Sequence, residues 1–252
     1  MKLFFRQFGE GKPFIILHGL FGLSDNWVSI AKILSQNYRV IIPDLRNHGQ
    51  SPHSPVFNYD AMTSDVLELM DELDLNQAVI LGHSMGGKVA MQFALQNPEF
   101  VEKLIVVDMS MRRYDGRQLH SDIIQAMMSI DFNTIESRTE VNRQLATTIH
   151  DERVRLFILK NLYRKTRYQL DWRLNLSDIN QNIDYVFDSI SSNTHYNGPA
   201  LFIKGEKSDY IQDSDLPKII QYFPNATFQT VSGAGHWVQA DNPEGFLEKI
   251  AV

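Results

Sequence analysis

Short apolar runs alternate with helical patterns along most of the chain. The central runs are apolar throughout, as in strands that are buried on both faces of a sheet. The runs that favour strands are KLFFRQF, PFIILHG, YRVIIPD, QAVILGH, KLIVVDM, PALFIKG and ATFQTVS. This alternation predicts an α/β fold in which a mostly parallel central sheet carries helices on both faces.

Two of the helical patterns predict which side chains face the sheet. Residues 26–36 and 62–73 place apolar side chains at helical spacing, and we expect each pattern to form one buried face. The predicted inward-facing residues are Trp27, Ile30, Ile33 and Leu34 in the first helix, and Met62, Val66, Leu69, Met70 and Leu73 in the second.

The alternation stops between Met109 and Asn197. This segment has helical periodicity, in SDIIQAMMSI and RVRLFILKNLYRK, but no clear strand. The run PALFIKG then resumes the sheet. The sequence therefore predicts a helical cap, residues 110–197, inserted between sheet strands of an α/β core made of residues 1–109 and 198–252.

Composition and charge indicate which classes of partner and which cellular compartment to expect. The chain of 252 residues has a formal net charge of −6, which disfavours nucleic acids and anionic membranes as partners. It has no cysteine, which excludes disulfides, zinc–cysteine sites and a thiol nucleophile. No apolar run approaches the roughly 18 residues of a membrane span, and charged residues interrupt the N-terminal segment. We expect a soluble cytoplasmic protein whose oligomeric state is open.

The stretch Gly82-His83-Ser84-Met85-Gly86 fits the motif G-x-S-x-G. It follows a predicted strand and opens a predicted helix, which is the context in which this motif holds a nucleophilic serine on a sharp turn. Small residues are needed two positions before and after the serine because the chain packs closely there. Ser84 is therefore the candidate nucleophile.

A serine hydroxyl needs a general base, and His236 is the candidate. It lies in VSGAGHWVQADNPEGF, after the last predicted strand and before a helix opened by Asn242 and Pro243. In an open α/β sheet, side chains at the carboxyl ends of strands collect at one edge. We therefore expect His236 to reach Ser84.

Two aspartates compete for the role of the acid that orients the histidine. Asp108 ends the run KLIVVD, and Asp209 follows PALFIKG in GEKSDYI. Both come at carboxyl ends of strands. Asp209 is one residue later than the usual G-x-x-D spacing after Gly205, where Ser208 stands instead.

An oxyanion hole needs two backbone N–H donors. Met85, directly after the candidate nucleophile, should give one of them. The other should come from HGLFG, residues 18–22, with Leu20 as the first candidate and Phe21 as the alternative.

With these residues identified, the chain resembles the α/β-hydrolase superfamily over nearly its whole length. HGLFGLSDNW, DLRNHGQS, GHSMGGKVAM, KLIVVDMS and AGHWVQADNPEGF occur in the order of that family. The resemblance is greatest to the YbfF-type acyl esterases and thioesterases and their mitochondrial relatives. It implies Asp108 as the acid, with Ser208 as an auxiliary residue, and no metal or organic cofactor.

The resemblance also implies the reaction, which is hydrolysis of small carboxylic esters or acyl thioesters through an acyl-enzyme. An acyl-CoA substrate would fit an excess of basic residues between Ser110 and Asn175. We favour solvated helix faces as the explanation, because three aspartates between Asn175 and Asn197 remove most of that excess. The main basic residues are Arg112, Arg113, Arg117, Arg153, Arg155, Lys160, Arg164, Lys165, Arg167 and Arg173. The candidates for lining an acyl pocket are Phe157, Leu162 and Trp172.

Other functions use the same fold and the same three residues. A carbon–carbon bond hydrolase or a lyase would differ only in its substrate. A ligand receptor would retain the residues and turn over slowly, so it would show ligand-dependent stabilisation with negligible turnover.

Overall fold

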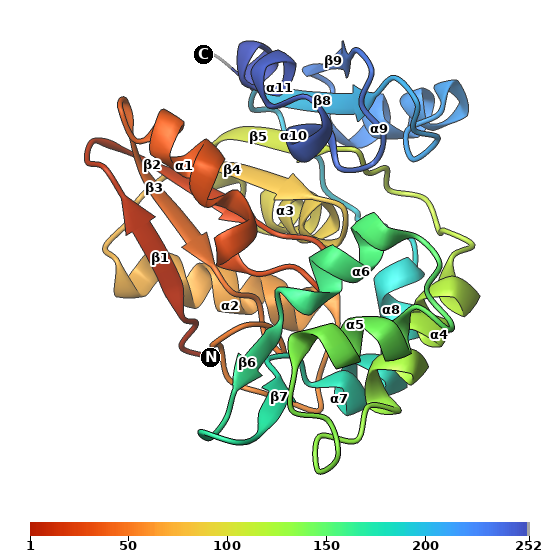
Figure 1. Ribbon diagram of the computed structural model, residues 1–252. Helices are drawn as coiled ribbons and strands as arrows, with labels where there is room; N and C mark the ends of the chain where they lie inside the picture. Colours follow the sequence, from red (N-terminus) through yellow and green to blue (C-terminus); the bar gives the residue numbers. More distant parts are fainter. Residues whose placement is uncertain (251–252) are drawn as a thin grey trace.

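The computed structural model describes residues 1–250 and contains a seven-stranded sheet (Figure 1). The strand order is β1-β3-β2-β4-β5-β8-β9, and only the β1–β3 pair at one edge is antiparallel. The strands are β1 (Phe5–Phe8), β2 (Lys12–Leu17), β3 (Tyr38–Pro43), β4 (Ala78–His83), β5 (Val101–Val107), β8 (Ala200–Gly205) and β9 (Ala226–Val231). The predicted mostly parallel sheet is confirmed, and each predicted run overlaps one of these strands, although β2 and β5 begin one and two residues before their runs.

Helices cover both faces of the sheet because consecutive side chains of a strand point to opposite sides. Ile15 and Leu17 of β2 belong to the apolar cluster that includes residues of α2 and α3, whereas Phe14 and Ile16 belong to the cluster that includes residues of α1 and α11. This two-sided burial explains why apolar residues follow one another in the buried parts of the central strands instead of alternating with polar ones. The helices outside the segment between β5 and β8 are η1 (Ser24–Trp27), α1 (Val28–Leu34), α2 (Tyr59–Glu72), α3 (Met85–Gln96), η2 (Pro98–Phe100), η3 (Asp213–Asp215), α9 (Leu216–Tyr222), α10 (Val238–Asp241) and α11 (Pro243–Ile250).

The predicted buried face is confirmed for α2 and only partly for α1. In α2 the four predicted residues from Met62 to Met70 are buried, and Leu73 packs partly buried against them. In the first helix Trp27 and Ile30 are buried, but Ile33 is 49% exposed and Ala31 is buried instead. The covered residues, Trp27, Ile30, Ala31 and partly Leu34, follow the i, i+3, i+4, i+7 spacing of one helical face. The prediction is wrong at Ile33 because that residue, six positions after Trp27, lies about 240° around the helix from it.

The segment between β5 and β8 is mainly helical and lies to one side of the sheet (Figure 1). Its elements are α4 (Arg117–Met128), α5 (Arg138–Leu145), α6 (Glu152–Leu159), β6 (Leu162–Arg164), β7 (Leu170–Trp172), α7 (Leu176–Gln181) and α8 (Ile183–Phe187). The expectation of no strand here is wrong, since β6 and β7 form an antiparallel hairpin. Three-residue strands are too short for periodicity to separate them from the end of a helix.

Hydrogen bonds join this segment to the sheet layer at several places. The Asn161 amide donates to the Phe21 carbonyl at 2.7 Å, and the Tyr59 hydroxyl donates to the Val186 carbonyl at 2.6 Å. The ammonium of Lys88, a fully buried residue of α3, donates to the Asp188 carbonyl just after α8. Burial lowers the pKa of Lys88 to about 7. These bonds fix the segment above the carboxyl ends of the strands.

The division into a core, 1–109 and 198–252, and a cap, 110–197, stays a prediction. Residues 251–252 of that core lie outside the described residues. Among residues 1–250, no helix combines the length and the apolar character that crossing a bilayer requires.

Candidate active site

Ser84 lies at a sharp turn between β4 and α3. Its backbone has φ 55° and ψ −121°, an unfavourable conformation for a residue with a Cβ atom. The turn closes only because its neighbours are glycines. A Cβ at Gly82 would lie 2.1 Å from the Gly86 carbonyl oxygen, and one at Gly86 would lie 2.3 Å from the Leu17 carbonyl oxygen.

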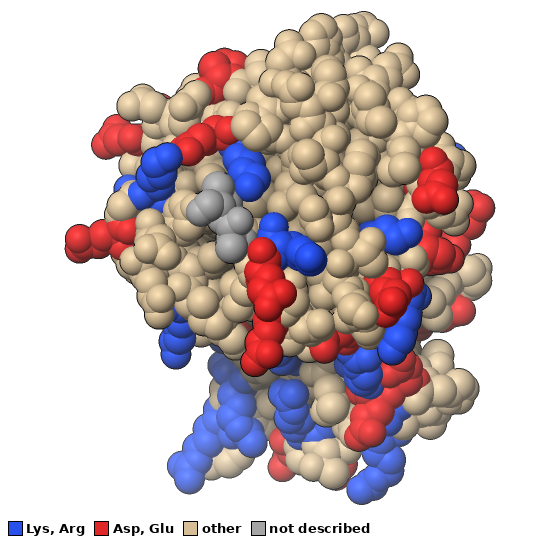
Figure 2. Space-filling view, turned by 90° about the horizontal axis from the view of Figure 1, so that it is seen from above, with Lys and Arg blue, Asp and Glu red and all other residues tan. Residues whose placement is uncertain are grey.

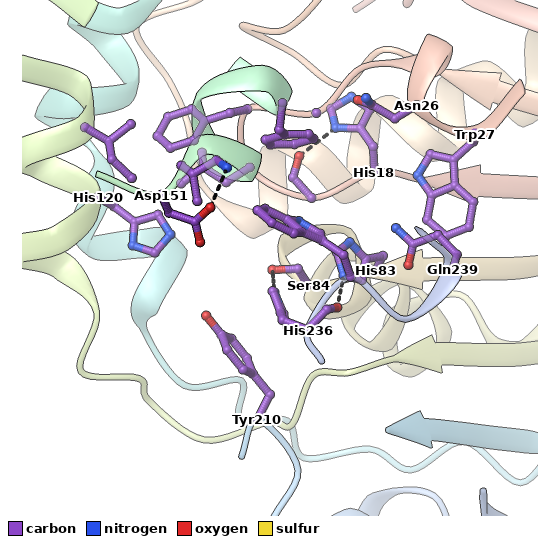
Figure 3. A pocket seen from close by; sticks show the side chains of 18 of the residues that line it. His18, Asn26, Trp27, His83, Ser84, His120, Asp151, Tyr210, His236 and Gln239 are labelled. Carbon is purple, nitrogen blue, oxygen red and sulfur yellow. Dashed lines mark hydrogen bonds between the residues drawn. The ribbon is translucent and has the colours of Figure 1, made fainter. Parts of the chain in front are cut away.

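The structure brings His236 and Asp108 to this turn. His236, in the loop after β9, has its Nε2 3.0 Å from the Ser84 Oγ (Figure 3). Its Nδ1 lies 2.7 Å from Oδ2 of Asp108, which follows β5. A carboxylate can only accept, so Nδ1 carries the proton and Nε2 is left to accept the proton of the Ser84 hydroxyl. The arrangement is that of a nucleophile, a base and an orienting acid.

Asp108 is fully buried, and donors surround its carboxylate. The Gly205 N–H donates to Oδ1 at 3.1 Å, and the Ser208 hydroxyl donates to Oδ2. A buried charge needs such partners because it has lost its water. Ser208 therefore contacts the candidate acid, and within residues 1–250 its hydroxyl makes no hydrogen bond to His236.

The structure does not bring Asp209 to the histidine. Asp209 is exposed, and among the described residues its carboxylate makes no hydrogen bond. Only its backbone carbonyl has a partner, the Arg112 guanidinium at 3.1 Å. The one-residue offset after Gly205 thus turns the carboxylate outward and leaves Ser208 at the inward position.

The candidate oxyanion donors lie beside Ser84. A Cβ at Gly19 would lie 3.1 Å from the Ser84 Cβ, so the loop of residues 18–22 passes directly over the nucleophile. Within residues 1–250, the N–H groups of Leu20 and Met85 have no hydrogen-bond partner. The N–H of Phe21 is already donated to Nε2 of His48 at 3.2 Å. Because the Phe21 N–H already has an acceptor, the Leu20 N–H is favoured over it as the second oxyanion donor.

Three buried histidines support this site, and sequence reasoning gave His48 no role. His18 accepts from the Leu45 N–H at 3.0 Å, while His48 holds the Phe21 N–H. Nε2 of His83 donates to the backbone carbonyl of His236 at 2.8 Å. Burial lowers the pKa of His18 to about 4 and the pKa values of His48 and His83 to about 3.

Tyr210 is a further residue that the sequence did not indicate. Its ring stacks on the His236 imidazole, with ring centroids 3.7 Å apart and planes inclined by 18°. Tyr114 stacks in turn on Tyr210 and donates its hydroxyl to the Tyr210 carbonyl at 2.6 Å. The sequence indicates a place for Tyr210 near the site only through its position two residues after Ser208.

A cavity of about 260 Å³ opens above Ser84 and His236 (Figure 3). Of the three predicted lining residues, only Phe157 lines it. Leu162 and Trp172 face each other across the β6–β7 hairpin, and the Trp172 indole donates to the Met127 carbonyl at 3.0 Å. The prediction is wrong for these two because it treated residue 162 as helical. The apolar lining that it missed includes Leu119, Ile123, Val154 and Trp237.

Four of the ten main basic side chains of the segment are paired with acidic ones. Ion pairs join Arg112 to Asp215, Arg117 to Asp184, Arg153 to Asp241 and Lys165 to Asp171. Figure 2 shows side chains of both signs on the face drawn, with Lys and Arg gathered toward its lower edge. Among residues 1–250 the other six form no ion pair, so ion pairs neutralise the basic excess of this segment only in part.

Comparisons with known proteins agree with this geometry. The family profile described as alpha/beta hydrolase fold matches residues 12–243. The chain is 41% identical to the zebrafish sn-1-specific diacylglycerol lipase ABHD11, over 96% of this chain and 78% of that protein. It is 31% identical to esterase YbfF of Escherichia coli, over 96% of this chain and 92% of that protein. A solved structure of a marine microorganism esterase is 43% identical, with a TM-score of 0.96 over 98% of this chain and 97% of that one.

We predict that His18, His48 and His83 stay neutral in the folded protein down to about pH 5. The pKa values of these histidines are lowered in the folded protein, whereas in the unfolded chain histidine titrates near 6.5. Below about pH 6.5 the unfolded chain therefore binds more protons than the folded protein. The free energy of unfolding therefore falls as the pH drops below about 6.5.

Imidazole NMR resonances, assigned by single substitutions, measure these titrations directly. The three signals should stay constant between pH 7.5 and pH 5 in buffer, and should titrate in urea. A midpoint near 6.5 in the folded protein would contradict the burial that the structure gives these rings.

Proposed function

Because the chain belongs to the α/β-hydrolase family and is a carboxylic ester hydrolase, we propose that its catalytic residues are Ser84, His236 and Asp108. The observation that carries this proposal is the continuous hydrogen-bonded series from the Asp108 carboxylate through His236 to the Ser84 hydroxyl. It ends beneath a cavity large enough for a small ester.

The proposed reaction proceeds in two halves. Nε2 of His236 takes the Ser84 proton while Oγ attacks the ester carbonyl carbon. The carbonyl oxygen gains negative charge, which the N–H groups of Leu20 and Met85 stabilise because neither has another acceptor. His236 then gives its proton to the leaving alcohol, and an acyl-enzyme remains.

Water repeats the sequence in the second half. His236 removes a proton from the water, whose oxygen attacks the acyl carbon, and the proton returns to the Ser84 Oγ as the acid product leaves. Asp108 keeps the imidazole in the tautomer that accepts at Nε2 and stabilises the imidazolium that forms twice in each cycle.

The substrate class beyond esters is part of the proposal. Acyl thioesters suit the same steps because a thiolate is a better leaving group than an alkoxide. We place oxygen esters first because relatives of the chain are named as a diacylglycerol lipase and an esterase. A cytoplasmic location stays a prediction that rests on the cysteine-free sequence.

We predict that Ser84→Ala lowers kcat for p-nitrophenyl butyrate by about 10³-fold or more, since the nucleophile is lost and only binding and the oxyanion donors remain. Ser214→Ala, an exposed matched change, should retain full activity. Circular dichroism checks that both variants are folded. Full activity in Ser84→Ala would refute the assignment of the nucleophile, and negligible turnover in the native protein would favour a receptor.

A second prediction separates the two aspartates. Asp108→Asn should lower kcat/KM for the same ester by about 10³-fold or more, because the amide no longer holds the imidazole in the required tautomer. Asp209→Asn should stay within about twofold, because its carboxylate is exposed and unpaired among the described residues. A larger loss in Asp209→Asn would overturn the assignment of the acid.

A further inference from the structure

A second, smaller pocket adjoins the cavity at Ser84. Its volume is about 20 Å³, which is room for a single water-sized group, since one water occupies about 10–15 Å³ of such space. Ser84, Leu20 and Met85 line it, so the nucleophile and the two proposed oxyanion donors surround the same small space. We refer to it as the oxyanion pocket, because the carbonyl oxygen of an ester attacked by Ser84 fits into it.

Six further side chains complete the wall of the oxyanion pocket. Three of them are apolar, Met109, Val186 and Phe187, and three carry polar groups, Tyr114, His120 and Tyr210. An oxyanion is stabilised only by groups that donate a hydrogen bond. A polar side chain of this wall can therefore contribute only if it has a proton that is not already shared with another acceptor.

Two of the three polar side chains have no free proton. The Tyr114 hydroxyl donates to the Tyr210 carbonyl at 2.6 Å and accepts from the Ser110 N–H at 2.7 Å. Nδ1 of His120 lies 2.9 Å from the Gly116 carbonyl oxygen, which can only accept, so Nδ1 carries the proton and Nε2 has none. Burial lowers the pKa of His120 from its ordinary value of 6.5, so this ring is neutral at pH 7.

The Tyr210 hydroxyl does have a free proton. Within residues 1–250 it makes no hydrogen bond, and its oxygen does not belong to the buried polar atoms that lack a partner, so it has accessible surface. Tyr210 lines both pockets, and Figure 3 shows its hydroxyl pointing into the cavity, with Ser84 on one side and His120 on the other. Burial, together with the nearby Asp108 carboxylate, raises the pKa of Tyr210, which keeps the hydroxyl protonated.

Tyr210 is held in place through its ring and its backbone. The ring stacks on His236, with centroids 3.7 Å apart, and on Tyr114, with centroids 5.1 Å apart. The Tyr210 N–H donates to the Ser208 Oγ at 3.3 Å. A donor that is fixed before the reaction needs no reorganisation when negative charge develops on the substrate, and this makes it effective in catalysis.

We propose that the Tyr210 hydroxyl donates a third hydrogen bond to the oxyanion, beside the N–H groups of Leu20 and Met85. Tyr210 is then a catalytic residue, because its hydroxyl touches the reacting oxygen, although it transfers no proton. It acts in both halves of the reaction, since a tetrahedral oxyanion forms in each. This inference rests on the proposed function and adds a residue to its machinery.

Tyr210→Phe tests the inference because it removes only the hydroxyl and retains the ring that stacks on His236. We expect kcat for p-nitrophenyl butyrate to fall by about tenfold or more, with KM within about threefold of the native value. The loss should be smaller than the roughly 10²- to 10³-fold cost of losing a principal oxyanion donor, because both backbone donors remain. Tyr168→Phe, the same change at an exposed position in the turn of the β6–β7 hairpin, should retain the native kcat.

A transition-state analogue measures the oxyanion itself. Ser84 should add to 1,1,1-trifluoropentan-2-one and form a hemiketal, whose oxygen carries negative charge in the same pocket. The ¹⁹F signal of the bound ketone changes when that oxygen takes up a proton, so the midpoint of its titration reports how well the pocket stabilises the charge. In Tyr210→Phe the midpoint should rise by about one pH unit or more, which matches a loss of about tenfold.

The outcomes separate this inference from the proposed function. A lower kcat together with a raised ¹⁹F midpoint supports the inference. An unchanged kcat in Tyr210→Phe overturns it, and so does a lower kcat with an unchanged midpoint, because the hydroxyl then does not act on the oxyanion. Circular dichroism checks that Tyr210→Phe is folded, and the midpoint stays measurable where its turnover is too slow to follow. Absence of all ester hydrolysis by the native protein would overturn the proposed function itself.

Discussion

The close packing of the chain against itself at Gly82 and Gly86 is the constraint on which the site depends. At both positions a side chain would overlap a backbone carbonyl, of Gly86 in one case and of Leu17 in the other. Only with these contacts in place can Ser84 keep φ 55° and project Oγ toward His236. The parallel pairing of β2, β4 and β5 then sets where Ser84 and Asp108 lie, because both follow the carboxyl ends of neighbouring strands.

Much of this arrangement could be predicted from the sequence because it follows from strand order and local pattern. The five inner strands are marked by largely apolar runs, the two edge strands by mixed runs of β-forming residues, and Ser84 by a turn that only glycines permit. The choice between Asp108 and Asp209 could not be made from spacing alone. It depends on how the loop after β8 folds back, which places Ser208 against the Asp108 carboxylate and turns Asp209 outward.

The residues that sequence reasoning missed act through contacts between distant segments. His48 holds the Phe21 N–H from 27 positions away, and Gln239 borders Trp27 in the cavity from the opposite end of the chain. Nothing in the local pattern around either residue indicates those contacts. Leu162 and Trp172 failed as pocket residues for the converse reason, since a short hairpin turns them toward each other.

The central claim is that Ser84 is the only nucleophile of the reaction and that His236 activates it. Reaction with a fluorophosphonate, followed by peptide mass spectrometry, tests it most directly because the reagent bonds only to an activated hydroxyl. The account predicts one label, on the peptide that contains Ser84, with a labelling rate about 100-fold or more lower in His236→Ala. A label on another residue, or an unchanged rate in His236→Ala, would contradict it.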